Sequence, residues 1–145
     1  MASAGLGVFA ILNGELEAAL ISISLCGALG GFLIYNWYPA SILPGDSLTY
    51  LCGAALFSTM VIGNMEKFGV FIFMPWFAEF ALKARGRFDA HSWGRLENGR
   101  LENQHNSIYS LTHVFMSKGF NEEEITIALI LLEVLIVTLG LLLFL

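Results

Sequence analysis

The chain has 145 residues, of which 57% are hydrophobic and 13% charged, and its mean hydropathy is +0.72. A soluble domain of this length cannot bury so large an apolar share, so the composition predicts a membrane protein. The formal net charge of −5 argues against nucleic acid as a partner.

Apolar runs separated by polar turns follow one another along the whole chain. The first, residues 5–12, is shorter than the roughly 20 residues that a helix needs to cross hydrocarbon, so it is predicted to be a partial span. In the next run Gly27 and Gly31 stand four residues apart, which predicts close packing against another helix of the chain. We predict a single all-α membrane domain, 1–145, a polytopic transmembrane helix bundle with about four further full spans at 16–35, 47–63, 68–82 and 125–145.

Two polar segments are predicted to share one membrane surface. Residues 83–121 form the one long polar region and contain six of the seven basic residues, which makes this loop cytoplasmic by the positive-inside tendency. The loop at 36–46 contains two prolines and two interfacial aromatic residues. Two crossings separate it from the basic loop, so both are expected on the cytoplasmic side.

Three local helix signals are also present. Pro75 is expected to kink the span at 68–82. In the basic loop, apolar residues at 108, 111 and 115 recur at helical spacing, which predicts a short amphipathic helix in the membrane interface. Asn121, with Glu124 three residues later, resembles a capping box at the start of the last span.

Asp46 is the first candidate for chemistry. It follows Pro44-Gly45 and stands immediately before an apolar span, which puts its carboxylate at the membrane surface. A hard oxygen ligand at this place suits Mg²⁺. The alternative is that Asp46 only caps the following helix, since Asp is a favoured N-cap residue.

A basic cluster is the second candidate. Lys83, Arg85 and Arg87 lie within five residues, a density that suits binding of a diphosphate through charge-assisted hydrogen bonds. The alternative is an anchor that pairs with anionic lipid headgroups.

Other ionisable residues have simpler interpretations. Glu79 lies one turn before Lys83, which predicts an ion pair. Glu133 falls inside the last apolar run, where an interhelical hydrogen bond is favoured over a catalytic role. The three histidines lack the spacing of a zinc site and are interpreted as surface residues: His91, His105 and His113.

Residues 36–46, Asn-Trp-Tyr-Pro-Ala-Ser-Ile-Leu-Pro-Gly-Asp, resemble the NWYP-to-GD signature of the polyprenyl-phosphate N-acetylhexosamine-1-phosphate transferases. The nearest branch is the dolichyl-phosphate GlcNAc-1-phosphate transferases of archaeal type. Leu43 departs from the signature, where an aromatic residue is commoner. Residues 83–88 are similar to the family's basic cytoplasmic loop, and residues 110–113 and the final apolar helix follow in the family's order.

The resemblance implies an enzyme that moves N-acetylglucosamine 1-phosphate from UDP-GlcNAc to a polyprenyl or dolichyl phosphate in the cell membrane, the first step of lipid-linked glycan assembly. It implies that Asp46 binds Mg²⁺ and that Arg85 and Arg87 hold the phosphate and sugar of the donor. Such chemistry uses cations to neutralise a phosphoryl group in transfer.

The family's earlier half has no counterpart in this sequence. Residues 13–17 superficially resemble its asparagine motif, but by the span count they lie on the wrong side of the membrane, so Asn13 is rejected as a metal ligand. The chain is therefore expected to be competent only with the missing half. A separate amino-terminal half or a homo-oligomer is the expected kind of protein partner. The alternative is a non-enzymatic membrane scaffold or regulatory remnant of such a transferase.

Overall fold

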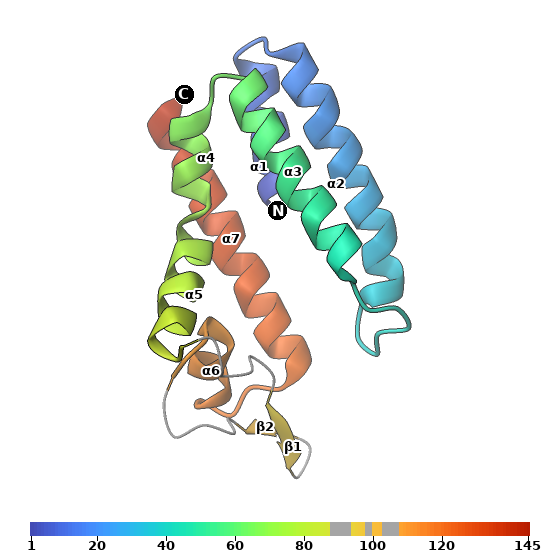
Figure 1. Ribbon diagram of the computed structural model, residues 1–145, viewed down its shortest axis with the longest axis vertical. Helices are drawn as coiled ribbons and strands as arrows, with labels where there is room; N and C mark the ends of the chain where they lie inside the picture. Colours follow the sequence, from blue (N-terminus) through green and yellow to red (C-terminus); the bar gives the residue numbers. More distant parts are fainter. Residues whose placement is uncertain (88–93, 98–99, 103–107) are drawn as a thin grey trace. The chain divides into compact units, whose positions relative to one another are not determined.

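The computed structural model describes residues 1–87, 94–97, 100–102 and 108–145. The chain folds into two compact units: the first is residues 1–72 with 133–145, and the second is residues 73–132. The predicted helical class is confirmed, with two three-residue strands as its exception. In chain order the elements are α1 (Ala2–Leu12), α2 (Leu16–Asn36), α3 (Asp46–Ile62), α4 (Glu66–Ile72), α5 (Met74–Arg85), β1 (Arg95–Glu97), β2 (Arg100–Glu102), α6 (Leu111–Met116) and α7 (Glu122–Phe144), as labelled in Figure 1.

The first unit is held together by close helix contacts. The helices α1, α2 and α3 pack on one another, and they lie side by side in Figure 1. An added Cβ at Gly5 of α1 would lie 2.6 Å from Val137 of α7, and one at Gly140 would lie 2.9 Å from the ring of Phe68. The rings of Phe9 and Phe68 stack with their centroids 4.3 Å apart. Small residues therefore let the backbones approach, and aromatic rings fill the remaining space.

In the part of the chain that the structure describes, two helices, α2 and α7, are long and apolar enough to cross a membrane. Only 22% and 11% of their most apolar windows are buried inside the protein, whereas the core helix of a soluble protein is mostly buried. Their apolar surface therefore needs lipid or further protein around it, which supports a membrane protein. The helices α1 and α3 are apolar but shorter, with 11 and 17 residues, so the count of four full spans is not confirmed.

The predicted span at 68–82 is two helices rather than one. Helix α4 ends at Ile72 and α5 begins at Met74, with Phe73 as its N-cap. Pro75 stands in the first turn of α5. Proline has no N–H and its ring clashes with the carbonyl four residues earlier, so it favours a helix start over a helix interior. Pro75 therefore starts a new helix, and the predicted span is broken before it instead of being kinked at it.

The second unit contains the polar region. Helix α5 continues to Arg85, so the connection begins at residue 86 rather than at 83. The strands β1 and β2 pair antiparallel. The predicted interfacial helix is wrong in extent: α6 has six residues and begins at Leu111, after Ile108. It packs on α5, and its His113 and Met116 are buried.

Candidate functional site

Asp46 is the first residue of α3 and its side chain is exposed. The N-cap is Gly45, whose carbonyl accepts from the N–H groups of Leu48 and Thr49. The interpretation of Asp46 as the N-cap is therefore wrong by one residue. The described residues offer no hydrogen-bond partner to its carboxylate, and only its carbonyl oxygen is engaged, accepting from Thr49 Oγ1 at 2.9 Å. A carboxylate in this position is free to bind a cation.

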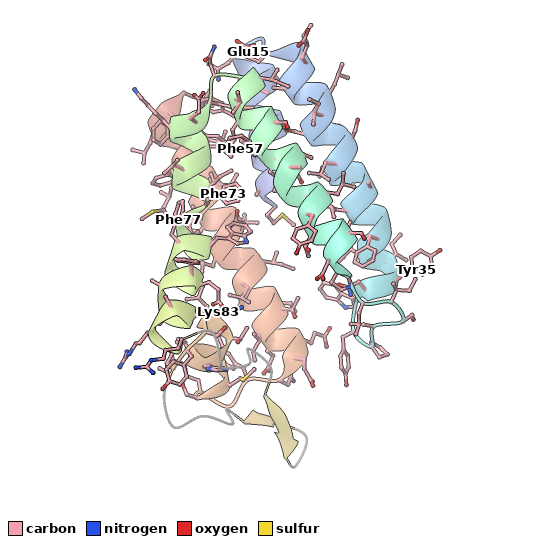
Figure 2. The ribbon with its side chains drawn as sticks, viewed as in Figure 1. Glu15, Tyr35, Phe57, Phe73, Phe77 and Lys83 are labelled. Carbon is pink, nitrogen blue, oxygen red and sulfur yellow. The ribbon has the colours of Figure 1, made fainter. Side chains whose placement is uncertain are left out.

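The loop before Asp46 is closed by hydrogen bonds to its own backbone. The amide Nδ2 of Asn36 donates to the carbonyl of Ile42 at 2.8 Å. The backbone N–H groups of Ser41 and Ile42 both donate to the carbonyl of Tyr35, in the last turn of α2. Tyr35 is labelled at this end of α2 in Figure 2. These bonds fold the loop back on α2 and fix the point from which α3 starts.

Arg85 and Arg87 follow one another at the end of α5. Arg85 is its last residue, and Arg87 has a φ of +53° with its N–H donating to the carbonyl of Ala84 at 3.0 Å. A non-glycine residue in this left-handed region costs roughly 1–2 kcal/mol. Both side chains are exposed, and no described residue forms an ion pair with either. Two guanidinium groups are thus available to an anionic ligand.

Glu79 has the most engaged carboxylate of the described residues. The predicted ion pair with Lys83 is confirmed, with Oε1 at 3.4 Å from Nζ. The same oxygen accepts a hydrogen bond from Ser110 Oγ at 2.8 Å, and Oε2 accepts from the backbone N–H of Leu111, also at 2.8 Å. The sequence interpretation missed the two hydrogen bonds, because 31 and 32 residues separate the partners.

His113 is fully buried, so its interpretation as a surface residue is wrong. Its Nδ1 accepts from the backbone N–H of Tyr109 at 3.3 Å, which assigns the proton of a neutral ring to Nε2. Its burial follows from its place on α6, which packs on α5. The other two histidines, His91 and His105, lie outside the described residues.

Glu133 has only 8% of its surface exposed, and its Oε1 has no hydrogen-bond partner among the described residues. The interhelical hydrogen bond expected for this side chain is therefore not found in the described part of the chain. Ser22, on α2, is likewise buried with an unpartnered Oγ. Buried polar atoms without partners are costly, so both positions are exceptions in an otherwise apolar unit.

The predicted site residues fall in different units. Asp46 belongs to the first unit, and Arg85 and Arg87 belong to the second. Their juxtaposition at one surface stays a prediction. No group of three or more His, Cys, Asp or Glu side chains gathers among the described residues.

Comparison with known proteins gives a consistent family. Residues 1–64 match the model of glycosyl transferase family 4. The chain is 36% identical, over 85% of its length, to a protein of Sulfolobus acidocaldarius provisionally named UDP-N-acetylglucosamine–dolichyl-phosphate N-acetylglucosaminephosphotransferase. It is 35% identical, over 78% of its length, to a protein of the same name from Saccharolobus solfataricus. A phospho-N-acetylmuramoyl-pentapeptide-transferase of Neisseria meningitidis is 25% identical over 97% of the chain.

The matches cover only part of each relative. The chain spans 38%, 35% and 41% of the lengths of these three proteins, respectively. No solved structure matches the chain significantly. Asp46 and its loop lie inside the region that matches the family model, whereas Arg85 and Arg87 lie after it.

Proposed function

We propose that this chain takes part in the transfer of N-acetylglucosamine 1-phosphate from UDP-GlcNAc to a polyprenyl phosphate such as dolichyl phosphate. The premise is that the chain belongs to glycosyl transferase family 4, whose model matches residues 1–64. An oxygen of the acceptor phosphate attacks the phosphorus that carries the sugar. The bond from this phosphorus to the bridging oxygen breaks, and UMP leaves with the bonding electron pair. The product is a polyprenyl diphosphate-linked sugar.

The observation that carries the proposal is the open carboxylate of Asp46 inside the family-matched region. Mg²⁺ in phosphoryl-transfer sites is usually held by one or two carboxylates together with substrate phosphates and water. An exposed carboxylate that has no partner among the described residues fits this pattern. A bound Mg²⁺ would neutralise charge on the donor diphosphate and stabilise UMP as the leaving group.

Arg85 and Arg87 are proposed to bind the phosphates of UDP-GlcNAc. Guanidinium groups form paired, charge-assisted hydrogen bonds with phosphate oxygens, and they keep their charge at any physiological pH. The two side chains are exposed, and they have no ion-pair partner among the described residues. Their role would be to orient the donor and to offset charge that develops on the phosphoryl group.

The proposed setting is the cell membrane. The loop at 36–46 and the basic loop at 83–121 would lie on its cytoplasmic side, where a soluble nucleotide meets a lipid acceptor. The concentration of basic residues after α5 supports this orientation. The relatives are longer than the aligned part, so we also propose that further helices, from a separate amino-terminal half or a second copy, complete the site.

The test is a transfer assay in lipid vesicles. The chain is reconstituted with and without the part of the Sulfolobus acidocaldarius relative that it does not cover, and label is followed from UDP-GlcNAc to polyprenyl phosphate. Mg²⁺-dependent transfer by the combination is expected.

Donor binding gives a second arm of the test. UDP-GlcNAc with Mg²⁺ is expected to raise the melting temperature of the chain, because a ligand of the native state stabilises it. Absence of both transfer and stabilisation would contradict the proposal and favour a non-enzymatic scaffold.

A further inference from the structure

The carboxylate of Glu79 joins two segments of the second unit. Its Oε1 lies within 2.8 Å of Ser110 Oγ and 3.4 Å of Lys83 Nζ, and its Oε2 accepts from the N–H of Leu111 at 2.8 Å. One side chain on α5 therefore holds both the start of α6 and a lysine one turn further along α5. Lys83 is labelled at this end of α5 in Figure 2.

The hydrogen bonds at Ser110 all run towards the carboxylate of Glu79. A carboxylate only accepts, so the hydroxyl proton of Ser110 points to Glu79. The hydroxyl of Thr112, 2.9 Å away, and its N–H, 3.3 Å away, must then donate to Ser110 Oγ. Ser110 is 1% exposed, so water cannot readily replace Glu79 as the acceptor.

The same carboxylate distinguishes the three cations at the end of α5. Lys83 is paired with Glu79, while Arg85 and Arg87 have no ion pair among the described residues. A lysine whose charge is already compensated is a poorer ligand for a diphosphate than an uncompensated guanidinium group.

We infer that Glu79 is a positioning residue for donor binding: it fixes the start of α6 and Lys83 on α5, and so leaves Arg85 and Arg87 as the cations that face the diphosphate. This inference rests on the proposed function for its donor and on the contacts of Glu79 for its mechanism. It assigns Lys83 to pairing with Glu79 rather than to binding the donor.

The first arm of the test needs no ligand. Hydrogen exchange at the Leu111 amide is measured in the wild-type chain and in Glu79→Ala, Glu79→Gln and Glu66→Ala. Loss of the acceptor should speed exchange about tenfold or more in Glu79→Ala, because the amide loses its bond. Glu79→Gln keeps an amide oxygen for Leu111 and should stay close to the wild type. Glu66 is exposed on α4, so Glu66→Ala is the matched control.

The second arm measures binding of UDP-GlcNAc with Mg²⁺ and, separately, of a short polyprenyl phosphate. The vesicles contain this chain together with the part of the Sulfolobus acidocaldarius relative that it does not cover. Glu79→Ala should weaken donor binding about tenfold and leave acceptor binding within about twofold, which a general loss of structure would not do. Lys83→Met should change donor affinity by no more than about threefold, whereas Arg85→Met should weaken it about tenfold or more.

The outcomes of the two arms distinguish the positioning role of Glu79 from the proposed transferase function. Unchanged exchange at Leu111 in Glu79→Ala would overturn the positioning role even if the chain binds UDP-GlcNAc. Equal losses of donor affinity in Lys83→Met and Arg85→Met would also overturn it. Failure of the wild type to bind UDP-GlcNAc, with the expected exchange result, would refute the proposed function and the donor part of the inference while the contact itself stands.

Discussion

Asp46 in the first unit and Glu79 in the second are helix carboxylates with opposite surroundings. The carboxylate of Asp46 is exposed and receives no hydrogen bond from the described residues, whereas that of Glu79 accepts two hydrogen bonds and forms an ion pair with Lys83. An unengaged carboxylate contributes little to folding and remains available to a ligand, while one engaged within the protein stabilises the fold and is a poorer ligand for a metal. The comparison predicts that substitutions at the two positions separate activity from stability.

The largest effect is expected for Asp46→Asn. The amide keeps the shape of the side chain but loses the charge that attracts Mg²⁺, so the rate of transfer should fall by at least about a hundredfold. The melting temperature should change by less than about 2 °C, since the Asp46 carboxylate has no hydrogen bond or ion pair to any residue that the structure describes. Removal of Mg²⁺ by a chelator should reduce the wild type to the level of the variant. Wild-type rates in Asp46→Asn would refute the metal-binding role, and Glu66→Gln is the matched control.

A smaller effect is expected at the end of α5. Arg87→Gly removes a proposed phosphate ligand and should raise the KM for UDP-GlcNAc about tenfold. Because glycine adopts the φ of +53° without strain, the free energy of unfolding should not decrease. Lys67→Met, at an exposed lysine of the first unit, should leave the KM unchanged. A loss of stability equal to the loss of affinity would indicate a structural role for Arg87.

Stability is expected to respond to Gly140→Ala. The added methyl group would lie 2.9 Å from Phe68 and 3.0 Å from Phe71, so the free energy of unfolding should fall by about 1–3 kcal/mol. Gly53→Ala, where nothing lies within 4 Å of the added Cβ, should raise it by up to about 1 kcal/mol. Unfolding is followed by circular dichroism in detergent. Equal responses at the two glycines would contradict the packing of α7 on α4.

The smallest effect is expected for Ser22→Ala. The Oγ of Ser22 is buried without a partner, so its removal should leave the free energy of unfolding unchanged or raise it by up to about 1 kcal/mol. The same substitution at Ser110, whose hydroxyl bonds to Glu79, should lower it by about 1–2 kcal/mol. A destabilised Ser22→Ala would indicate a polar partner outside the described residues.

Local signals predicted much of the helical structure. The bounds of α2 and α3 lie within one residue of the predicted spans at 16–35 and 47–63, because apolar runs end at polar turns. The capping box is confirmed in both directions, with the N–H of Glu124 donating to Asn121 Oδ1 and the N–H of Asn121 donating to Glu124 Oε2, each at 3.0 Å. Such features depend on neighbours in sequence, which is why they could be predicted.

Features that depend on contacts between residues far apart in the sequence could not be predicted in this way. The sequence indicated close packing at Gly27 and Gly31, but nothing in the described residues lies within 4 Å of a Cβ added at either. Close contacts are found at other glycines, Gly5 and Gly140 among them, since the choice of face depends on tertiary packing. The bonds of Glu79 to residues 110 and 111 are equally long-range.

One local signal was overlooked. Asn98-Gly99 stands between the similar triplets at 95–97 and 100–102, and an Asn-Gly pair between two such runs is typical of a tight hairpin. The antiparallel strands β1 and β2 occupy these two triplets. The predicted proximity of Asp46 to the two arginines remains a prediction, because the residues belong to separate units.

The loop between α2 and α3 is braced through main-chain atoms. Its hydrogen bonds run to the carbonyls of Ile42 and Tyr35, and the side chains of Tyr38 and Leu43 are exposed. A loop tethered in this way tolerates exchange of those outward side chains while its path is preserved. The surface beside Asp46 can therefore change its shape and polarity through these side chains while the start of α3 stays in place.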